Sequence, residues 1–123
     1  MTDAREQGLQ VFRELLPGVV PDGDVDLRDG TFGDELFEIA INNVFGRLWG
    51  RGGLSRRERS LVTLGILIAL RATDELKVHV QIARNNGLTE DEIAEVIYHA
   101  SGYAGLPAAN TACRIAREVL DAG

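Results

Sequence analysis

The chain has 123 residues, which is enough for one ordinary domain and too few for two. Its formal net charge of -6 at pH 7 argues against a nucleic-acid partner, because phosphate binding depends on clustered basic charge. Hydrophobic residues make up 45% of the chain, and a chain this small leaves part of its apolar surface uncovered, which favours a homo-oligomer.

No segment has the pattern of a membrane span or a signal peptide. The longest apolar stretch, residues 61–70, is about half as long as a membrane helix, and we expect it to form a helix buried on all sides. The first residues lack the apolar core of a signal peptide. The single cysteine, Cys113, cannot form an intrachain disulfide, which fits a reducing compartment. We therefore expect a cytoplasmic protein with no membrane partner.

Helical spacing of hydrophobic residues dominates the first half of the chain. It predicts an amphipathic helix over residues 4–16, whose apolar face contains Leu9, Phe12, Leu15 and Leu16. Residues 17–32 are expected to form an ordered loop. A second helix is expected over residues 34–45, and its buried side chains would be Leu36, Phe37, Ala40, Ile41 and Val44. Residues 46–53 are read as a glycine-rich connector.

Capping residues define the helices of the second half. Ser55 and Glu58 form a capping box that opens a third helix over residues 56–70. Thr73 is expected to be the N-cap of a fourth helix over residues 74–85, which ends at Asn86 and Gly87.

A second capping box and a proline define the last two helices. Thr89 and Glu92 open a fifth helix that extends to about residue 101, and the glycines at 102 and 105 are expected to interrupt the chain. Pro107 suits the first turn of a sixth helix that ends at Leu120. Because no segment alternates with a period of two, the sequence predicts an all-α fold of about six helices in a single domain over residues 1–123.

Common metal, nucleotide and serine-nucleophile motifs are missing from the sequence. His79 and His99 are far apart in the chain and the one cysteine gives them no zinc-type partner, so no metal site is expected. There is also no G-x-S-x-G motif, P-loop or dinucleotide fingerprint. Phosphoryl transfer and hydride transfer therefore have no support.

Arginines are concentrated between residues 47 and 71 of this acidic chain. They are Arg47, Arg51, Arg56, Arg57, Arg59 and Arg71. The guanidinium group makes paired hydrogen bonds with planar carboxylates, although each arginine alone is explained as well by solvation or by pairing with Asp or Glu. Arg47 and Arg51 are the stronger candidates for binding an anionic ligand, because they flank Trp49 in the glycine-rich connector.

Glu75 and His79 lie four residues apart, and therefore on one face of the predicted fourth helix. A carboxylate and an imidazole in this arrangement can act as a general acid/base pair. A structural interpretation stays open for both residues. The helix dipole favours an acidic residue such as Glu75 in the first turn, and a histidine on an apolar helix is often a hydrogen-bonded core residue.

Residues 103–110 form a third candidate feature, since a turn there leads small residues into the start of a helix. A ligand could approach the backbone closely at this point, but ordinary capping and tight helix packing explain the pattern equally well. Cys113 lies inside the last helix and is expected to be a small buried hydrophobic residue.

Together these segments resemble the carboxymuconolactone decarboxylase family over residues 45–119. The matching motifs are Phe45–Leu54, Arg59–Thr63, Glu75–His79, Asn85–Gly87, Glu92-Ile93, Glu95-Val96 and Tyr103–Asn110. The resemblance implies an alkylhydroperoxidase-like helical fold assembled as a trimer or hexamer. Thiol peroxidases of the wider superfamily have two cysteines where this chain has Ala72 and Glu75, and a proton-relay Glu where it has Ser60. The resemblance is therefore to the decarboxylase branch.

That branch implies decarboxylation of 4-carboxymuconolactone to the 3-oxoadipate enol-lactone, in aromatic catabolism through the β-ketoadipate pathway. The reaction would need no cofactor, because the unsaturated lactone accepts the electron pair that carbon dioxide leaves behind. The protein would bind a small anionic lactone, stabilise charge on the lactone oxygen and return a proton.

The resemblance also suggests a role for each candidate residue. His79 would donate to the lactone oxygen or to carbon, and Glu75 would orient it. The residues expected to bind the substrate are Arg47 and Arg51, which would anchor carboxylates, and Trp49 and Tyr103, which would line the pocket. Two alternatives stay open: a related enzyme of the same fold that processes another lactone or a β-oxo acid, and a non-catalytic oligomer that binds an anionic metabolite.

Overall fold

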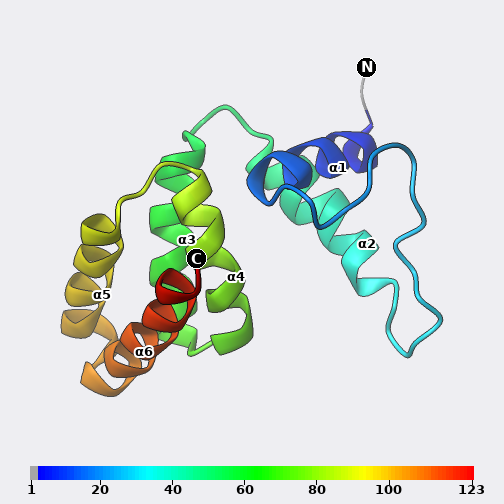
Figure 1. Cartoon of the computed structure of the whole chain (residues 1–123). Helices are drawn as coiled ribbons and strands as arrows, with labels where there is room; N and C mark the ends of the chain where they lie inside the picture. Colours follow the sequence, from blue (N-terminus) through cyan, green and yellow to red (C-terminus); the bar gives the residue numbers. More distant parts are fainter. Residues whose placement is uncertain (1–2) are drawn as a thin grey trace. The chain divides into compact units, whose positions relative to one another are not determined.

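The structure, a computed structural model, describes residues 3–123 and contains helices but no strand within that range. The elements are α1 (Ala4–Leu15), α2 (Leu36–Ala40), the π-helix η1 (Ile41–Trp49), α3 (Arg56–Leu70), α4 (Thr73–Asn85), α5 (Glu90–Ala104) and α6 (Leu106–Ala122) (Figure 1). The prediction of an all-α fold with six helices is confirmed. None of the described helices is long and apolar enough to cross a membrane.

The chain forms two compact units, one that ends at Leu54 and one that spans Ser55–Gly123. The first unit contains α1, α2 and η1, and the second contains α3 to α6. The expectation of a single domain over the whole chain stays a prediction.

Helix α1 begins and packs as its sequence predicts. The Asp3 carboxylate accepts a hydrogen bond from the Glu6 backbone N–H at 2.7 Å, which satisfies one of the free donors of the first turn. Leu9, Phe12 and Leu15 are buried on one face. The Phe12 ring packs edge-on against two aromatic rings of the following helices, those of Phe37 and Phe45, with centroids 5.3 and 4.9 Å away.

Two glycines let α1 cross η1 at very short range. A Cβ placed on Gly8 would overlap the carbonyl oxygen of Ile41 and lie 2.8 Å from its carbonyl carbon. A Cβ on Gly46 would likewise overlap the carbonyl oxygen of Ala4. The backbones of the two helices therefore touch at points where only glycine fits.

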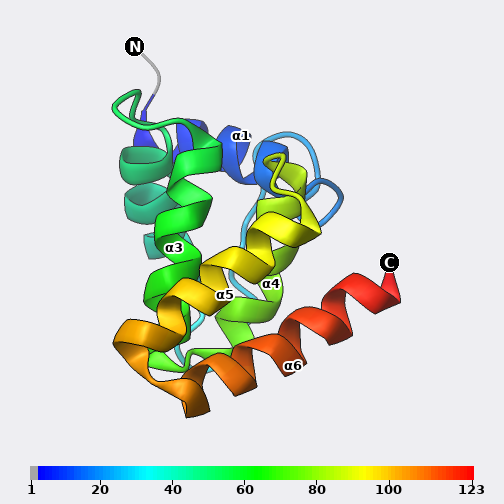
Figure 2. The same ribbon diagram turned by 90° about the vertical axis from the view of Figure 1, so that its left-hand side faces the viewer.

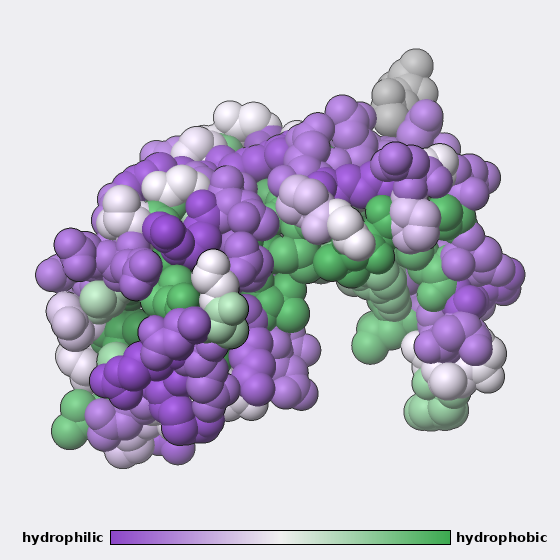
Figure 3. Space-filling view, viewed as in Figure 1, coloured by the Kyte–Doolittle hydropathy of each residue, from purple (hydrophilic) through white to green (hydrophobic). Residues whose placement is uncertain are grey.

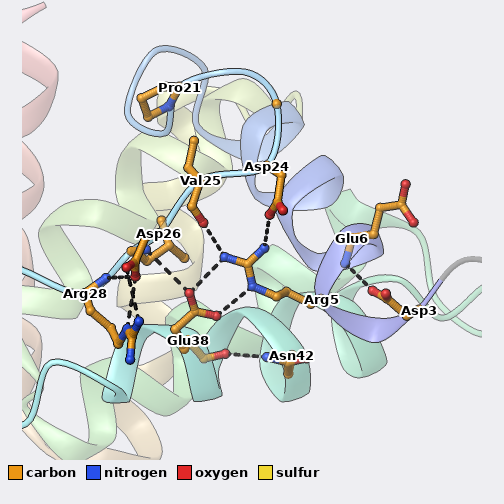
Figure 4. A network of polar contacts seen from close by, with 12 residues as sticks. Asp3, Arg5, Glu6, Pro21, Asp24, Val25, Asp26, Arg28, Glu38 and Asn42 are labelled. Carbon is orange, nitrogen blue, oxygen red and sulfur yellow. Dashed lines mark hydrogen bonds and ion pairs between the residues drawn. The ribbon is translucent and has the colours of Figure 1, made fainter.

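Arg5 holds the long loop between α1 and α2 in place (Figure 4). Its guanidinium donates to both carboxylate oxygens of Glu38 at 2.8 and 2.9 Å, to Asp24 at 2.7 Å and to the carbonyl oxygen of Val25. The hydrogen bonds from Arg5 keep the pKa of Glu38 below its usual value. Residues 24 and 25 of the loop are thus tied to both neighbouring helices, as expected for an ordered loop.

The second helix differs from its prediction, because it starts at Leu36 and continues as the π-helix η1 to Trp49. Residues 46–49, the first part of the expected connector, therefore belong to η1. Leu36 and Val44, expected to be buried, are 72% and 38% exposed, so that prediction is wrong. The wider turn of a π-helix changes which positions share a face. Ile41, Phe45 and Trp49 are the buried positions here.

Both predicted capping boxes of the second unit are confirmed. The Ser55 hydroxyl accepts from the Glu58 N–H at 3.1 Å, and the Glu58 carboxylate accepts from the Ser55 N–H at 2.8 Å. Thr89 and Glu92 repeat this exchange at the start of α5, at 3.1 and 2.9 Å. These short-range bonds explain why α3 and α5 begin where the sequence predicts.

Two other helix boundaries of this unit were predicted wrongly. Ala72, not Thr73, is the N-cap of α4, because only Arg71 and Ala72 separate it from α3 and Thr73 is already helical. Helix α5 does not stop before Gly102 but continues to Ala104. It ends at Gly105, whose φ of 96° is a backbone conformation that side chains disfavour.

The core of the second unit lies between α3, α4, α5 and α6, whose arrangement Figure 2 shows from the side. Its largest contributors include Leu64, Ile68, Leu88, Ile93 and Ile115. Helix α3 was expected to be buried on all sides, and this is wrong. Its residues Val62, Ile66 and Leu70 are 54%, 52% and 70% exposed, because the other helices of the unit cover only one side of α3.

A polar link joins the start of α3 to the end of α4. The Asn86 side chain donates to the Ser60 hydroxyl at 2.9 Å and to the Arg56 carbonyl oxygen at 3.4 Å. Ser60 is only 1% exposed. Ser60 therefore makes a buried contact between α3 and the end of α4.

Candidate active site

Helix α4 places Glu75 and His79 one turn apart, as predicted. Leu76 and Val80 of the same helix face the core, so the helix is fixed at this point. Glu75 is exposed, whereas His79 is half-buried and its Nδ1 atom is fully enclosed. Burial lowers the pKa of His79, and the nearby charge of Glu75 opposes this effect only in part.

The lowered pKa of His79 decides what the residue can do at neutral pH. A neutral imidazole offers one N–H donor and one acceptor nitrogen. It can therefore donate a hydrogen bond to a developing oxyanion or exchange a proton with a substrate. Its partial burial strengthens such an interaction, because water competes less for the donor.

The arginine-tryptophan segment lies in the first unit and is mostly helical. Arg47 and Trp49 belong to η1, which corrects their expected position in a loop. Arg51 follows the helix, and its backbone N–H donates to the Leu48 carbonyl oxygen at 3.1 Å. Both arginines are exposed, whereas Trp49 is only 6% exposed and so offers little surface to a ligand in this chain. Their roles in substrate binding stay predictions.

Tyr103 lines a cavity of about 840 Å³ within the second unit, between α3 and α5. Its ring packs against that of His99, with centroids 5.3 Å apart and planes tilted by 34°. Glu75 and His79 do not line this cavity. Of the predicted site residues, the structure thus brings Glu75 and His79 together on α4 and places Tyr103 in a separate cavity.

His99 is a cavity residue that the sequence reasoning did not select. Glu95 precedes it by four residues and also lines the cavity, which repeats the spacing of Glu75 and His79 on the next helix along the chain. This repeated Glu-x-x-x-His pattern is the sequence feature that could have indicated His99.

An ion pair balances the charge of Glu92, an acidic residue that lines the cavity. Arg57 of α3 pairs with the Oε2 atom of Glu92, whose Oε1 atom accepts the Thr89 N–H of the capping box. For Arg57, the explanation by pairing with an acidic residue is therefore confirmed.

Within residues 3–123, no group of three or more His, Cys, Asp and Glu side chains could hold a metal ion.

Hydrophobic residues also appear on the surface of both units, among the polar ones (Figure 3). In the first unit they include Phe32, Leu36 and Leu48, and in the second Val62, Ile66 and Leu70. Val62, Ile66 and Leu70 are spaced four residues apart and therefore share one exposed face of α3.

Comparison with known proteins assigns this helical chain to a family. Residues 34–118 match the profile of the carboxymuconolactone decarboxylase family, a range that begins before the expected core of residues 45–119. The 4-carboxymuconolactone decarboxylase of Acinetobacter baylyi is 42% identical over 116 residues, which cover 94% of this chain and 85% of that protein.

Two further relatives share part of this similarity. The nitrosuccinic acid decarboxylase of Metarhizium robertsii is 34% identical over 115 residues, covering 81% of this chain and 80% of its own length. An uncharacterized 15.0 kDa protein of Paracoccus denitrificans is 39% identical over 77 residues, covering 61% of this chain and 58% of its own length. From the family match and these identities, the chain belongs to the carboxymuconolactone decarboxylase family.

Proposed function

We propose that this chain is an enzyme that decarboxylates 4-carboxymuconolactone to the 3-oxoadipate enol-lactone without a cofactor. The observation that carries the proposal is the 42% identity, over 94% of the chain, to an enzyme named for its action on this lactone. The half-buried His79 beside Glu75 supports it, because the reaction needs a proton donor in a partly dry site.

The proposed reaction breaks one carbon–carbon bond and forms one carbon–hydrogen bond. The bond between the ring carbon and its carboxylate breaks, carbon dioxide leaves, and the electron pair moves into the unsaturated lactone. His79 donates a hydrogen bond to the lactone oxygen where negative charge develops, and Glu75 orients the imidazole. A proton, delivered by His79 or by water, then adds to carbon and gives the enol-lactone.

The substrate carries two carboxylates, and arginine is the side chain best suited to hold them. We assign this role to Arg47 and Arg51, which are both exposed. Tyr103 and Trp49 are proposed to line the substrate pocket. Tyr103 is exposed, although the cavity that it lines does not include Glu75 or His79, and the burial of Trp49 makes it the less favoured of the two.

A second candidate function keeps the reaction type and changes the substrate. It is favoured by the relative named as a nitrosuccinic acid decarboxylase, which is 34% identical over 81% of this chain. In this case the same residues would remove carbon dioxide from another small acid, such as a related lactone or a β-oxo acid. Binding of an anionic metabolite without turnover is the outcome expected if neither decarboxylation occurs.

We also propose that the protein works as a homo-oligomer, a trimer or a hexamer, in the cytoplasm. The exposed apolar residues of α3, which include Val62 and Ile66, support association. Sedimentation equilibrium at micromolar concentration tests this proposal directly. A monomer across the concentration range would contradict it.

The experiment that tests the function compares two substrates. Purified protein is mixed with freshly generated 4-carboxymuconolactone or with nitrosuccinic acid, with and without a chelator, and carbon dioxide and product are followed by NMR. We expect fast, chelator-insensitive release from the lactone alone. Release from nitrosuccinic acid alone would support the second candidate. No release above the spontaneous rates from either acid would refute both decarboxylations.

A further inference from the structure

We infer that the cavity between α3 and α5 is a second binding site, which takes a small cation with an apolar body, such as an arylalkylammonium ion. The inference goes beyond the proposed function and does not depend on it, because neither Glu75 nor His79 lines this cavity. The cavity volume of about 840 Å³ falls within the range of roughly 300–1,000 Å³ that is usual for small-molecule sites.

The first argument is the apolar lining of the cavity. Both helices contribute residues with a short side chain or none, which are Gly65, Ala69, Ala100 and Ala104. They leave room for a ligand between the helices, and Leu61 and Val96 add larger apolar surfaces. Leu61 and Val96 also pack against the buried core of the unit, so this lining keeps its shape without a ligand. An apolar ligand body can therefore bind there with little reorganisation of the protein.

The second argument is the charge of the lining. Glu92 and Glu95 line the cavity, and no lysine or arginine of the described residues does. The Glu92 carboxylate is already engaged by Arg57 and by the Thr89 N–H. Glu95 is exposed, and no cationic side chain within residues 3–123 pairs with it. One uncompensated negative charge therefore lies at this cavity, and it favours a cationic ligand over an anionic one.

The third argument is the pair of rings that follows Glu95 along α5. Glu95, His99 and Tyr103 are spaced four residues apart, so they share one side of the helix, and all three line the cavity. The two rings pack with centroids 5.3 Å apart, and each limits the motion of the other. The face of a tyrosine ring attracts an ammonium group, and a neutral imidazole accepts a hydrogen bond from one. Tyr103 is 87% exposed, which leaves ring surface for its proposed contact with the lactone.

An NMR titration with three probes of similar shape tests the inference. The probes are 2-phenylethylammonium, neutral 2-phenylethanol and anionic 3-phenylpropionate, which share a phenyl ring and an ethyl chain and differ in charge. The ring signals of the two histidines are assigned with His99→Gln and His79→Gln. We expect the cation to shift the His99 signal saturably and to leave the His79 signal in place. The alcohol should bind about fivefold more weakly, the upper end of what an exposed ion pair contributes, and the anion more weakly still.

A single carboxylate should account for the preference for the cation. Glu95→Gln is expected to weaken binding of 2-phenylethylammonium about fivefold and to leave binding of 2-phenylethanol unchanged. Glu90→Gln is the matched control, because Glu90 is an exposed glutamate of the same helix that does not line this cavity. Its affinity for the cation should equal that of the wild type. Both substitutions keep the size of an exposed side chain, so neither is expected to prevent folding.

Three results would overturn the inference. Equal affinities for the cation and the alcohol would show an apolar groove without charge selection. A Glu95→Gln variant that binds the cation as tightly as the wild type would remove the carboxylate from the site. No shift of the His99 signal with any probe would exclude a small-molecule site, and a His99 signal that then depends on protein concentration would assign the groove to a second copy of the chain. Because binding is measured without turnover, none of these results depends on the decarboxylation.

Discussion

The contact between α1 and η1 predicts that Gly8→Ala destabilises the first unit. In most helices this substitution is stabilising, because alanine has a higher helix propensity than glycine by about 1 kcal/mol. Here the new methyl group would overlap the Ile41 carbonyl oxygen and lie 2.9 Å from the Ile41 Cγ2 atom. Its main neighbour is backbone, so a change of rotamer cannot relieve the overlap.

The expected magnitude follows from these two opposing terms. Overpacking of a close contact costs about 1–3 kcal/mol, and the overlap with backbone puts Gly8→Ala at the upper end. After subtraction of the propensity gain, we expect the free energy of unfolding to fall by about 2 kcal/mol. With a urea m-value of about 2 kcal/mol per molar, the midpoint should move down by about 1 M.

The assay is urea denaturation followed by the fluorescence of Trp49, the only tryptophan of the chain. Since Trp49 is buried in η1, its emission reports on the unit that contains the contact. Gly52→Ala, in the same unit, is the control, because a Cβ there meets no atom within 4 Å and should cost nothing. A Gly8→Ala midpoint equal to or above that of the wild type would refute the close crossing of α1 and η1.

Three further predictions concern single polar groups. Burial lowers the pKa of folded His79 below its ordinary value of 6.5, so below about pH 6.5 the unfolded chain binds more protons than the folded one. The stability advantage of wild type over His79→Gln is therefore full above about pH 6.5 and is lost as the pH falls through the folded pKa. Urea unfolding midpoints of the two proteins that keep a constant difference from pH 7 to pH 5 would contradict this. Arg5→Gln should lower the free energy of unfolding by about 1–2 kcal/mol in low-salt urea melts, because the partly buried Glu38 carboxylate loses its charged donor. An unchanged urea midpoint would show that the loop between α1 and α2 does not depend on this ion pair. Asn86→Ala should cost about 1–2 kcal/mol, since it removes the donor that reaches the buried Ser60 hydroxyl, and a double-mutant cycle with Ser60→Ala should recover most of that loss as coupling energy.

The helix starts that depend on short-range hydrogen bonds could be predicted from the sequence. The capping boxes at Ser55 and Thr89 each need only four consecutive residues, and both form as expected. The start of α4 could not be read in this way. Thr73 is a good N-cap residue, but the very short turn after α3 places it inside the helix.

The glycine-rich stretch after Phe45 shows why tertiary contacts can reverse a local interpretation. Glycines usually indicate a loop, yet Gly46 lies inside the helix η1. Glycine is needed at this position because α1 passes too close for any side chain. The π-helical turns that shift the buried face to Ile41 and Trp49 have no clear sequence pattern. The expected burial of Val44 failed for this reason, since it assumed the period of an α-helix.

The candidate site was only partly predictable. The four-residue spacing of Glu75 and His79 places them on one helical face, and the structure adds that only His79 is partly buried. Spacing could not indicate which residues meet across helices. The cavity that joins Tyr103 to His99 depends on the packing of α5 against α3, which is set by contacts far apart in the sequence.

The most direct test of the proposed function is the rate of carbon dioxide release from 4-carboxymuconolactone by wild type, His79→Gln and Lys77→Gln. Lys77 lies on the same helix with a side chain that is 54% exposed, so its variant controls for changes to α4. We predict that His79→Gln lowers kcat by about 100- to 1,000-fold, the usual effect of losing one oxyanion donor, and that Lys77→Gln keeps the wild-type rate. A His79→Gln enzyme with nearly full activity would remove His79 from the mechanism, and a wild type no faster than the spontaneous reaction would contradict the decarboxylase proposal itself.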